Sequence, residues 1–145
     1  MDVELSDDEH LRALAALEAV VGNNDGALVA LAGDAGERPL PTLLAAYGQH
    51  TLHRILVAAA GLTPAMDHGE TRRLIAEING EPAGRLVGVL ADALHSQAAL
   101  AGDHPAVAKS IGRSVLLAVH AFTDADNEDA LMLLRALRNE VLRKA

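Results

Sequence analysis

The stretch from 84 to 101 constrains the fold most, because it is a helical pattern with almost no side suited to water. At about 100° per residue, its larger aliphatic side chains fill one broad arc. The opposite side is narrow and carries small residues at four-residue spacing, which let a second helix backbone come close. The broad arc holds Leu86, Val87, Val89, Leu90, Ala93, Leu94 and Leu100, and the narrow one holds Gly84, Gly88, Ala91, His95 and Ala99. We therefore expect this segment, extended to about 82–101, to be the central helix of a bundle.

Helical patterns with clear start and stop signals cover the rest of the chain. Residues 6–9 form a capping box, and residues 22–26 tolerate the left-handed backbone that ends a helix. The apolar run 27–32 can be a buried strand or a short helix, and the helix is favoured because a lone strand would leave its backbone unpaired. Further helical patterns cover 41–60, 69–79, 82–101, 105–122 and about 130–144. The expected fold is all-α, a compact orthogonal or up-down bundle of six to seven helices in one domain, 1–145, with 1–5 frayed.

Two residues add detail to these patterns. Asp67, three residues before Glu70, reads as the cap of the helix that follows it. Gly48 lies inside a long helix, where it costs about 1 kcal/mol against alanine. We expect close approach of another helix to compensate this cost, with the small side of the 84–101 segment as the candidate.

Composition narrows the range of partners. The chain has 20 acidic and 12 basic residues and a formal net charge of −8. Such a charge repels the phosphates of nucleic acids and of anionic membranes. No apolar run approaches the ~18 residues of a membrane-spanning helix, and cysteine is absent. We expect no nucleic acid or membrane partner, and a cytoplasmic location because the acidic start does not resemble an export signal.

Seven histidines are the most reactive side chains, and His50 and His53 lie one helical turn apart. This spacing can place two ligands of one metal ion on a single helix face. The remaining ligands would have to come from elsewhere in the chain. We interpret the two residues as solvated or interface histidines, keep them as weak candidates for a metal site, and expect no cofactor.

Asp92 and His95, three residues apart, form a pair that we expect to be partly buried and hydrogen-bonded. A buried imidazole beside a carboxylate can act as a base or a pH switch. No nucleophile is indicated nearby, so we interpret the pair as a polar contact at a helix crossing. Glu-x-x-His and His-Glu-x-x-His patterns are absent from the sequence, and we assign no catalytic residue.

Charge is distributed unevenly between the two ends of the chain. Residues 1–34 hold eight acidic side chains against Arg12 alone, whereas four basic side chains from 135 onward face only Glu140. The first and last helices can therefore pair within one chain or across a symmetric homodimer. Apolar side chains that widen the stripe of the last helix favour the dimer. The expected interface residues are Leu133, Leu137, Val141, Leu142, Arg135 and Arg138.

The leading hypothesis for function is a non-catalytic interaction protein, such as an adaptor, a regulator or an immunity-type inhibitor. Its acidic helical surface would bind a protein partner with a basic surface. The alternative is a small-molecule-binding sensor or a metal-dependent enzyme, because helical bundles hold ligand pockets between their helices. That alternative would use His50, His53, His95 and either Asp67 or Asp92.

Overall fold

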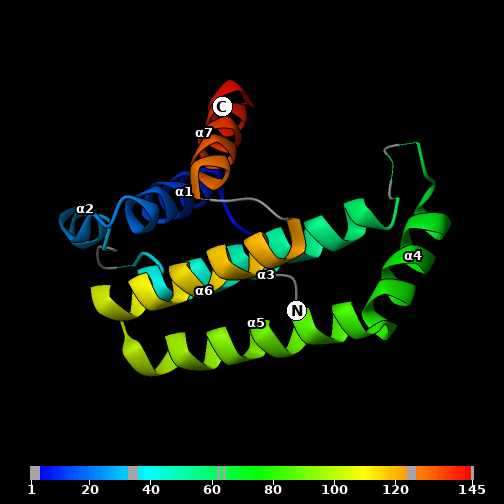
Figure 1. Cartoon of the computed structure of the whole chain (residues 1–145), viewed down its shortest axis with the longest axis horizontal. Coiled ribbons are helices and arrows are strands. Elements are labelled where there is room, and N and C mark those ends of the chain that lie inside the picture. Colours follow the sequence, from blue (N-terminus) through cyan, green and yellow to red (C-terminus); the bar gives the residue numbers. More distant parts are fainter. Residues whose placement is uncertain (1–3, 33–35, 62, 64, 124–126, 145) are drawn as a thin grey trace.

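The computed structural model describes residues 4–32, 36–61, 63, 65–123 and 127–144, and the side chains of these residues other than 122–123, 127–131, 133 and 144. Over these ranges the chain forms seven helices and no strand, so the all-α prediction is confirmed (Figure 1). The helices are α1 (Asp7–Val21), α2 (Asp25–Ala30), α3 (Leu40–Ala59), α4 (His68–Gly80), α5 (Pro82–Ala101), α6 (Pro105–Thr123) and α7 (Asn127–Lys144). The apolar run that could have been a strand is helical in α2. None of the described helices is long and apolar enough to span a membrane.

Local capping signals set the starts of α1 and α4 as the sequence predicts, whereas α7 begins at Asn127, earlier than the predicted position of about 130. The Ser6 hydroxyl accepts from the Glu9 backbone N–H at 3.2 Å, and the Glu9 carboxylate accepts from the Ser6 N–H at 2.9 Å. This capping box satisfies two backbone donors at the start of α1. Asp67 caps α4 in the same way, accepting from the Glu70 N–H at 2.8 Å. The sequence predicted a frayed segment over residues 1–5. Residues 1–3 lie outside the described residues, and Leu5 packs against the core.

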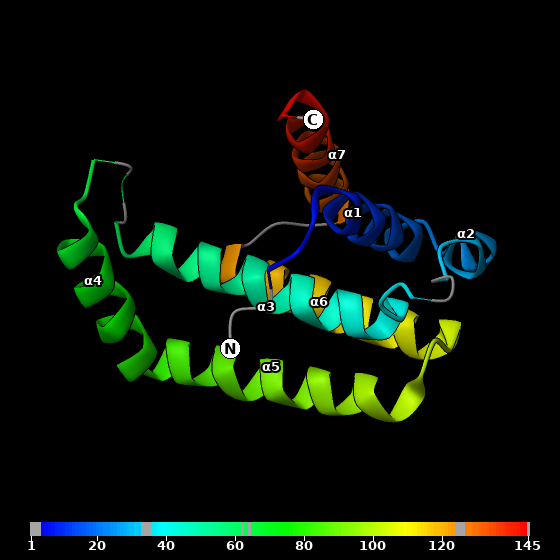
Figure 2. The same cartoon turned by 180° about the vertical axis from the view of Figure 1, so that it is seen from behind.

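The helices form three levels that are stacked perpendicular to the long axis of the molecule (Figures 1 and 2). α3 and α6 form the middle level, with α1 and α7 on one side of it and α5 on the other. α5 runs antiparallel to both middle helices, and α4 closes the end where α3 leads into α5. The core accordingly lies on both sides of α3 and α6, where Leu43, Leu44 and Ile111 are fully buried.

The helix at the centre of the bundle is α3, and the expectation that 82–101 would be central is wrong. α3 contacts α1, α4, α5 and α6. A run of its residues from Leu43 to Gly48 is buried without interruption. α5 instead lies at the margin, where it packs against α3, α4 and α6.

The close approach expected at Gly48 is made by α6. A Cβ atom at Gly48 would lie 2.5 Å from Cγ2 of Val115, so only glycine fits beside that side chain. Nothing lies within 4 Å of the same position at Gly88 in α5. The small side of α5 therefore receives no neighbouring backbone at that residue.

Candidate functional site

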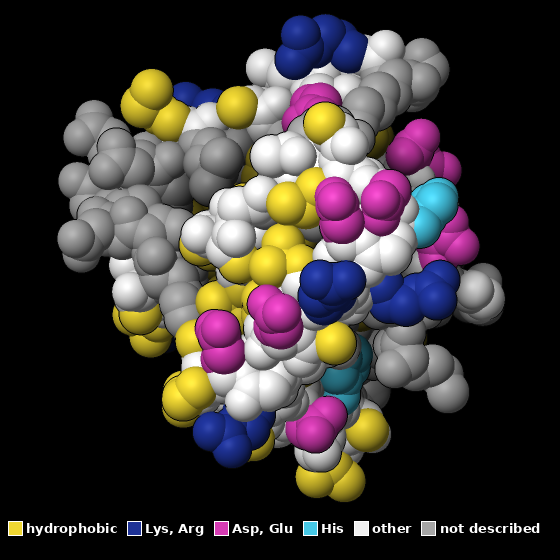
Figure 3. Space-filling view, turned by 90° about the vertical axis from the view of Figure 1, so that its right-hand side faces the viewer, with side chains coloured by type: hydrophobic (Ala, Val, Ile, Leu, Met, Phe, Trp, Pro, Cys, Tyr) yellow, Lys and Arg dark blue, Asp and Glu magenta, His cyan; other side chains and the backbone are white. Residues whose placement is uncertain are grey.

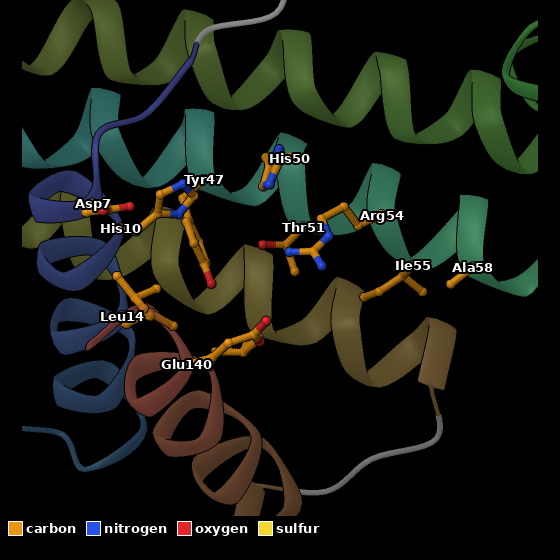
Figure 4. A pocket seen from close by; sticks show the side chains of 12 residues that line it. Asp7, His10, Leu14, Tyr47, His50, Thr51, Arg54, Ile55, Ala58 and Glu140 are labelled. Atoms are coloured by element: carbon orange, nitrogen blue, oxygen red, sulfur yellow. The ribbon is translucent and has the colours of Figure 1, made fainter. Parts of the chain in front are cut away.

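A cavity of about 390 Å³ opens between α1, α3 and α7 (Figure 4). Its volume falls within the range of about 300–1,000 Å³ that is typical of small-molecule sites. Polar side chains and an apolar floor both contribute to it. The lining consists of Asp7, His10, Leu14, Tyr47, His50, Thr51, Arg54, Ile55, Ala58, Leu137, Glu140 and Val141.

Three rings form a cluster at one end of this cavity. The ring of His10 lies edge-on to Tyr47, with centroids 5.8 Å apart and an interplanar angle of 78°. It lies in the same way against His50, at 5.7 Å and 62°. Such edge-to-face contacts fix the orientation of rings. α1 and α3 thus present two imidazoles to one cavity, although 40 residues separate them in the sequence.

Tyr47 and Arg54 lie two turns apart on α3. The side chain of Tyr47 is buried, and this burial raises the pKa of its hydroxyl above the ordinary 10.0, while a hydrogen bond with Thr51 and the charge of Arg54 oppose the rise. Tyr47 therefore remains a neutral hydroxyl at physiological pH. The guanidinium of Arg54 is exposed and contributes to the lining of the cavity.

The two candidate metal ligands of α3 separate in the structure. His50 is exposed and lines the cavity, whereas His53 is half-buried and does not line it. The described residues include no group of three histidine, aspartate or glutamate side chains that could hold a metal ion. A metal site would need at least one further ligand. His50 belongs to the ring cluster with His10.

His95 and Asp92 do not form the buried pair expected from the sequence. Nε2 of His95 lies 2.8 Å from Oε1 of Gln49 on α3, and Asp92 is exposed. The inner side of α5 faces α3, so His95 finds its partner there and not on its own helix. Asp67, the other acidic candidate, is occupied as the cap of α4.

The expected interface residues of α7 are partly used within the chain. Leu137 and Val141 pack against the core. Nη1 of Arg138 lies 3.0 Å from Oε2 of Glu18, so the basic last helix pairs with the acidic first helix of the same chain. Arg135 and Leu142 are exposed, and the side chain of Leu133 lies outside the described residues. The charge asymmetry thus has an intrachain explanation.

A second feature lies on the side of α5 that faces away from α3. Leu86, Val89 and Leu100 are 67%, 69% and 92% exposed, and the exposed Ala93 lies between the last two. We refer to these four residues as the outer face of α5. The exposed polar residues Ser96 and Gln97 lie between Ala93 and Leu100 on this side, and no described helix covers the outer face.

Charge is mixed at the end of the molecule formed by α4. Figure 3 views this end and shows acidic and basic side chains interspersed. The exposed Glu70 and Glu77 of α4 alternate with the exposed Arg72 and Arg73. This end of the molecule therefore does not present charges of a single sign.

No protein family matches the sequence, and no curated protein or solved structure is detectably similar to the chain. Function has to be inferred from the cavity and from the outer face of α5.

The sequence contained part of the signal for the cavity. His10 falls on the apolar side of the first helix, and Tyr47 falls on the apolar side of the third. A polar ring on an apolar helix face indicates a contact with another helix. Which helix supplies the contact depends on the tertiary packing of α1 against α3, and no local pattern specifies it.

Proposed function

We propose that this protein is a non-catalytic interaction protein that associates through the outer face of α5, and that a second copy of the chain covers this face. The observation that carries the proposal is the row of Leu86, Val89 and Leu100, each more than 60% exposed. These residues lie on one side of a single helix and span about 21 Å at 1.5 Å per residue. Exposed apolar side chains grouped on one side of a helix are typical of interaction sites in soluble proteins.

The two sides of α5 differ in what covers them. The inner side buries Val87, Ala91, Leu94 and Ala98 against the bundle. A single exposed leucine on a protein surface needs no explanation. A helix that is apolar on both sides but covered on one is typical of an element whose other side is covered by a partner.

Charges beside the outer face support a second copy as that partner. Arg85 and Asp92 are both exposed and lie two turns apart along the same edge of the face. Two-fold symmetry brings the same surface of each copy together. If two α5 helices run antiparallel and cross near Val89, Arg85 of each copy lies opposite Asp92 of the other. The nearby Ala93 is small enough to let the two helices come close.

A partner with a basic surface is the second candidate for this interaction. The net charge of −8 favours it. Two observations rank it below a second copy. Glu18 of the acidic first helix is already paired with Arg138, and the exposed charges of α4 are mixed.

Light scattering of two matched variants tests the proposal. Leu86 and Leu117 are both 67% exposed, the first on α5 and the second on α6. We expect the wild-type mass to rise from 15.1 kDa toward twice that value as concentration increases. Leu86→Glu should keep the mass at 15.1 kDa, and Leu117→Glu should behave as the wild type does. A wild-type protein that stays monomeric at every concentration, or equal behaviour of the two variants, would contradict the proposal.

A further inference from the structure

We infer that the cavity between α1, α3 and α7 is a binding site for a small zwitterion, namely an amino acid with an aliphatic side chain. The inference does not depend on the proposed dimer, because α5 contributes no residue to the lining. It rests on the size of the cavity, its apolar floor, and charges of both signs on its walls.

The floor of the cavity fits an aliphatic group. Three helices converge on this apolar part of the cavity. They supply Leu14 from α1, Ile55 from α3, and Leu137 and Val141 from α7. With a volume of about 390 Å³, the cavity lies near the lower end of the range for ligand sites. A ligand with a short branched side chain therefore fits better than a larger cofactor.

The walls carry charges of both signs. Arg54 reaches into the cavity from α3 and Glu140 reaches in from α7, while Asp7 lies toward the end formed by α1 (Figure 4). A ligand with only a negative charge would meet two carboxylates, and a ligand with only a positive charge would meet the guanidinium. A zwitterion satisfies both signs. Its carboxylate can accept two parallel hydrogen bonds from Arg54, and its ammonium group can donate to the carboxylates.

Two imidazoles and a hydroxyl complete the walls between these charges. His10 and His50 are held in the ring cluster, and Thr51 lies between His50 and Arg54 on the cavity side of α3. Each imidazole has two ring nitrogens that can take part in hydrogen bonds. Such groups can serve either end of a zwitterion, and the edge-on contacts of His10 hold both imidazoles in place before a ligand binds.

Calorimetry with three related ligands tests the chemical class. The full chain is titrated with L-leucine, with 4-methylpentanoate, which lacks the amino group, and with 3-methylbutylamine, which lacks the carboxylate. We expect leucine to bind once per chain, and each analogue to bind at least tenfold more weakly. Equal binding of the acid or the amine would overturn the assignment of a zwitterion, and a lack of saturable binding by leucine would overturn the site.

Two pairs of variants locate the binding. Arg54→Gln should weaken leucine binding at least tenfold, whereas Arg73→Gln on α4 should leave it unchanged. Ala58→Phe should block the cavity by volume, whereas Ala59→Phe, at the next exposed position of α3, should not. Unchanged circular dichroism confirms that each variant is folded. If leucine binds equally to Ala58→Phe and Ala59→Phe, its site lies elsewhere and the inference is wrong.

Discussion

Gly48 and Gly88 both lie inside helices, and we predict that replacement by alanine stabilises the protein at Gly88 but not at Gly48. At Gly48 the new Cβ would lie 2.5 Å from Cγ2 and 3.4 Å from Cγ1 of Val115. Val115 is 1% exposed, and its branched side chain has one strongly preferred rotamer in a helix, so it cannot turn away. Gly88 is exposed, and nothing lies within 4 Å of the new Cβ.

The size of the difference follows from two terms. Alanine is favoured over glycine in a helix interior by about 1 kcal/mol at both positions. Overpacking costs about 1–3 kcal/mol and applies only at Gly48. We therefore expect Gly88→Ala to raise the free energy of unfolding by about 1 kcal/mol. Gly48→Ala should leave it unchanged or lower it by up to about 2 kcal/mol, the difference between the two terms.

Urea unfolding followed by circular dichroism measures both free energies, with the two variants at one protein concentration. The slope against urea should stay the same, because neither change alters the surface exposed on unfolding. If Gly48→Ala stabilises the protein as much as Gly88→Ala does, α6 does not approach α3 as closely as described. The placement of α3 at the centre would then be refuted.

Three further predictions concern single contacts. Tyr47 is the one tyrosine of the chain, and burial raises its pKa, so its absorbance titration should have a midpoint above pH 10.0 when folded and close to it in urea. Because the folded state favours the protonated hydroxyl of Tyr47, the contribution of Tyr47 to stability is present below the unfolded pKa and is lost as the pH rises through the higher folded pKa. Equal midpoints in the folded and the unfolded protein would contradict the burial. A double-mutant cycle of Glu18→Gln and Arg138→Gln should give a coupling of about 0.5–1 kcal/mol, because the pair is partly buried, and zero coupling would mean that α7 does not pair with α1 there. Ser6→Ala should lower the free energy of unfolding by about 1 kcal/mol through loss of the cap, and an unchanged value would argue against the capping box.

Features set by neighbouring residues could be predicted from the sequence, because their physical cause is local. The capping box at Ser6 and the cap at Asp67 depend on side chains within three residues of the backbone groups that they satisfy. The stop after α1 likewise depends on local conformation, and Asn23 there has a positive φ of 52°. These signals fixed the helix starts and ends without reference to the rest of the chain.

Features that need a distant neighbour could not be predicted in the same way. Helical periodicity revealed that α5 is apolar on two sides, but not that the chain supplies a neighbour for only one of them. The contact at Gly48 was predicted, yet its partner proved to be α6. The pairing of His95 with Gln49 and the meeting of His10 with His50 depend equally on which helices pack together.

The charge asymmetry of the chain is an intermediate case. Sequence alone predicted that the first and last helices attract each other, and left open whether they do so within one chain or between two. The ion pair of Glu18 with Arg138 lies within one chain. This contact moves the expected dimer interface away from α7 and leaves the outer face of α5 as its location.

The α5 dimer is tested most directly by sedimentation of two charge-reversal variants, alone and in an equimolar mixture. Arg85→Glu places a carboxylate opposite Asp92 of the other copy, and Asp92→Arg places a guanidinium opposite Arg85, so each variant alone should dimerise more weakly. In a mixed dimer both pairs have opposite charges again. With about 0.7 kcal/mol for each of the two pairs, the mixture should dimerise about tenfold more tightly than either variant alone. A mixture that sediments as the average of the two variants would show that Arg85 and Asp92 do not meet across a two-fold axis, and would contradict the proposed dimer.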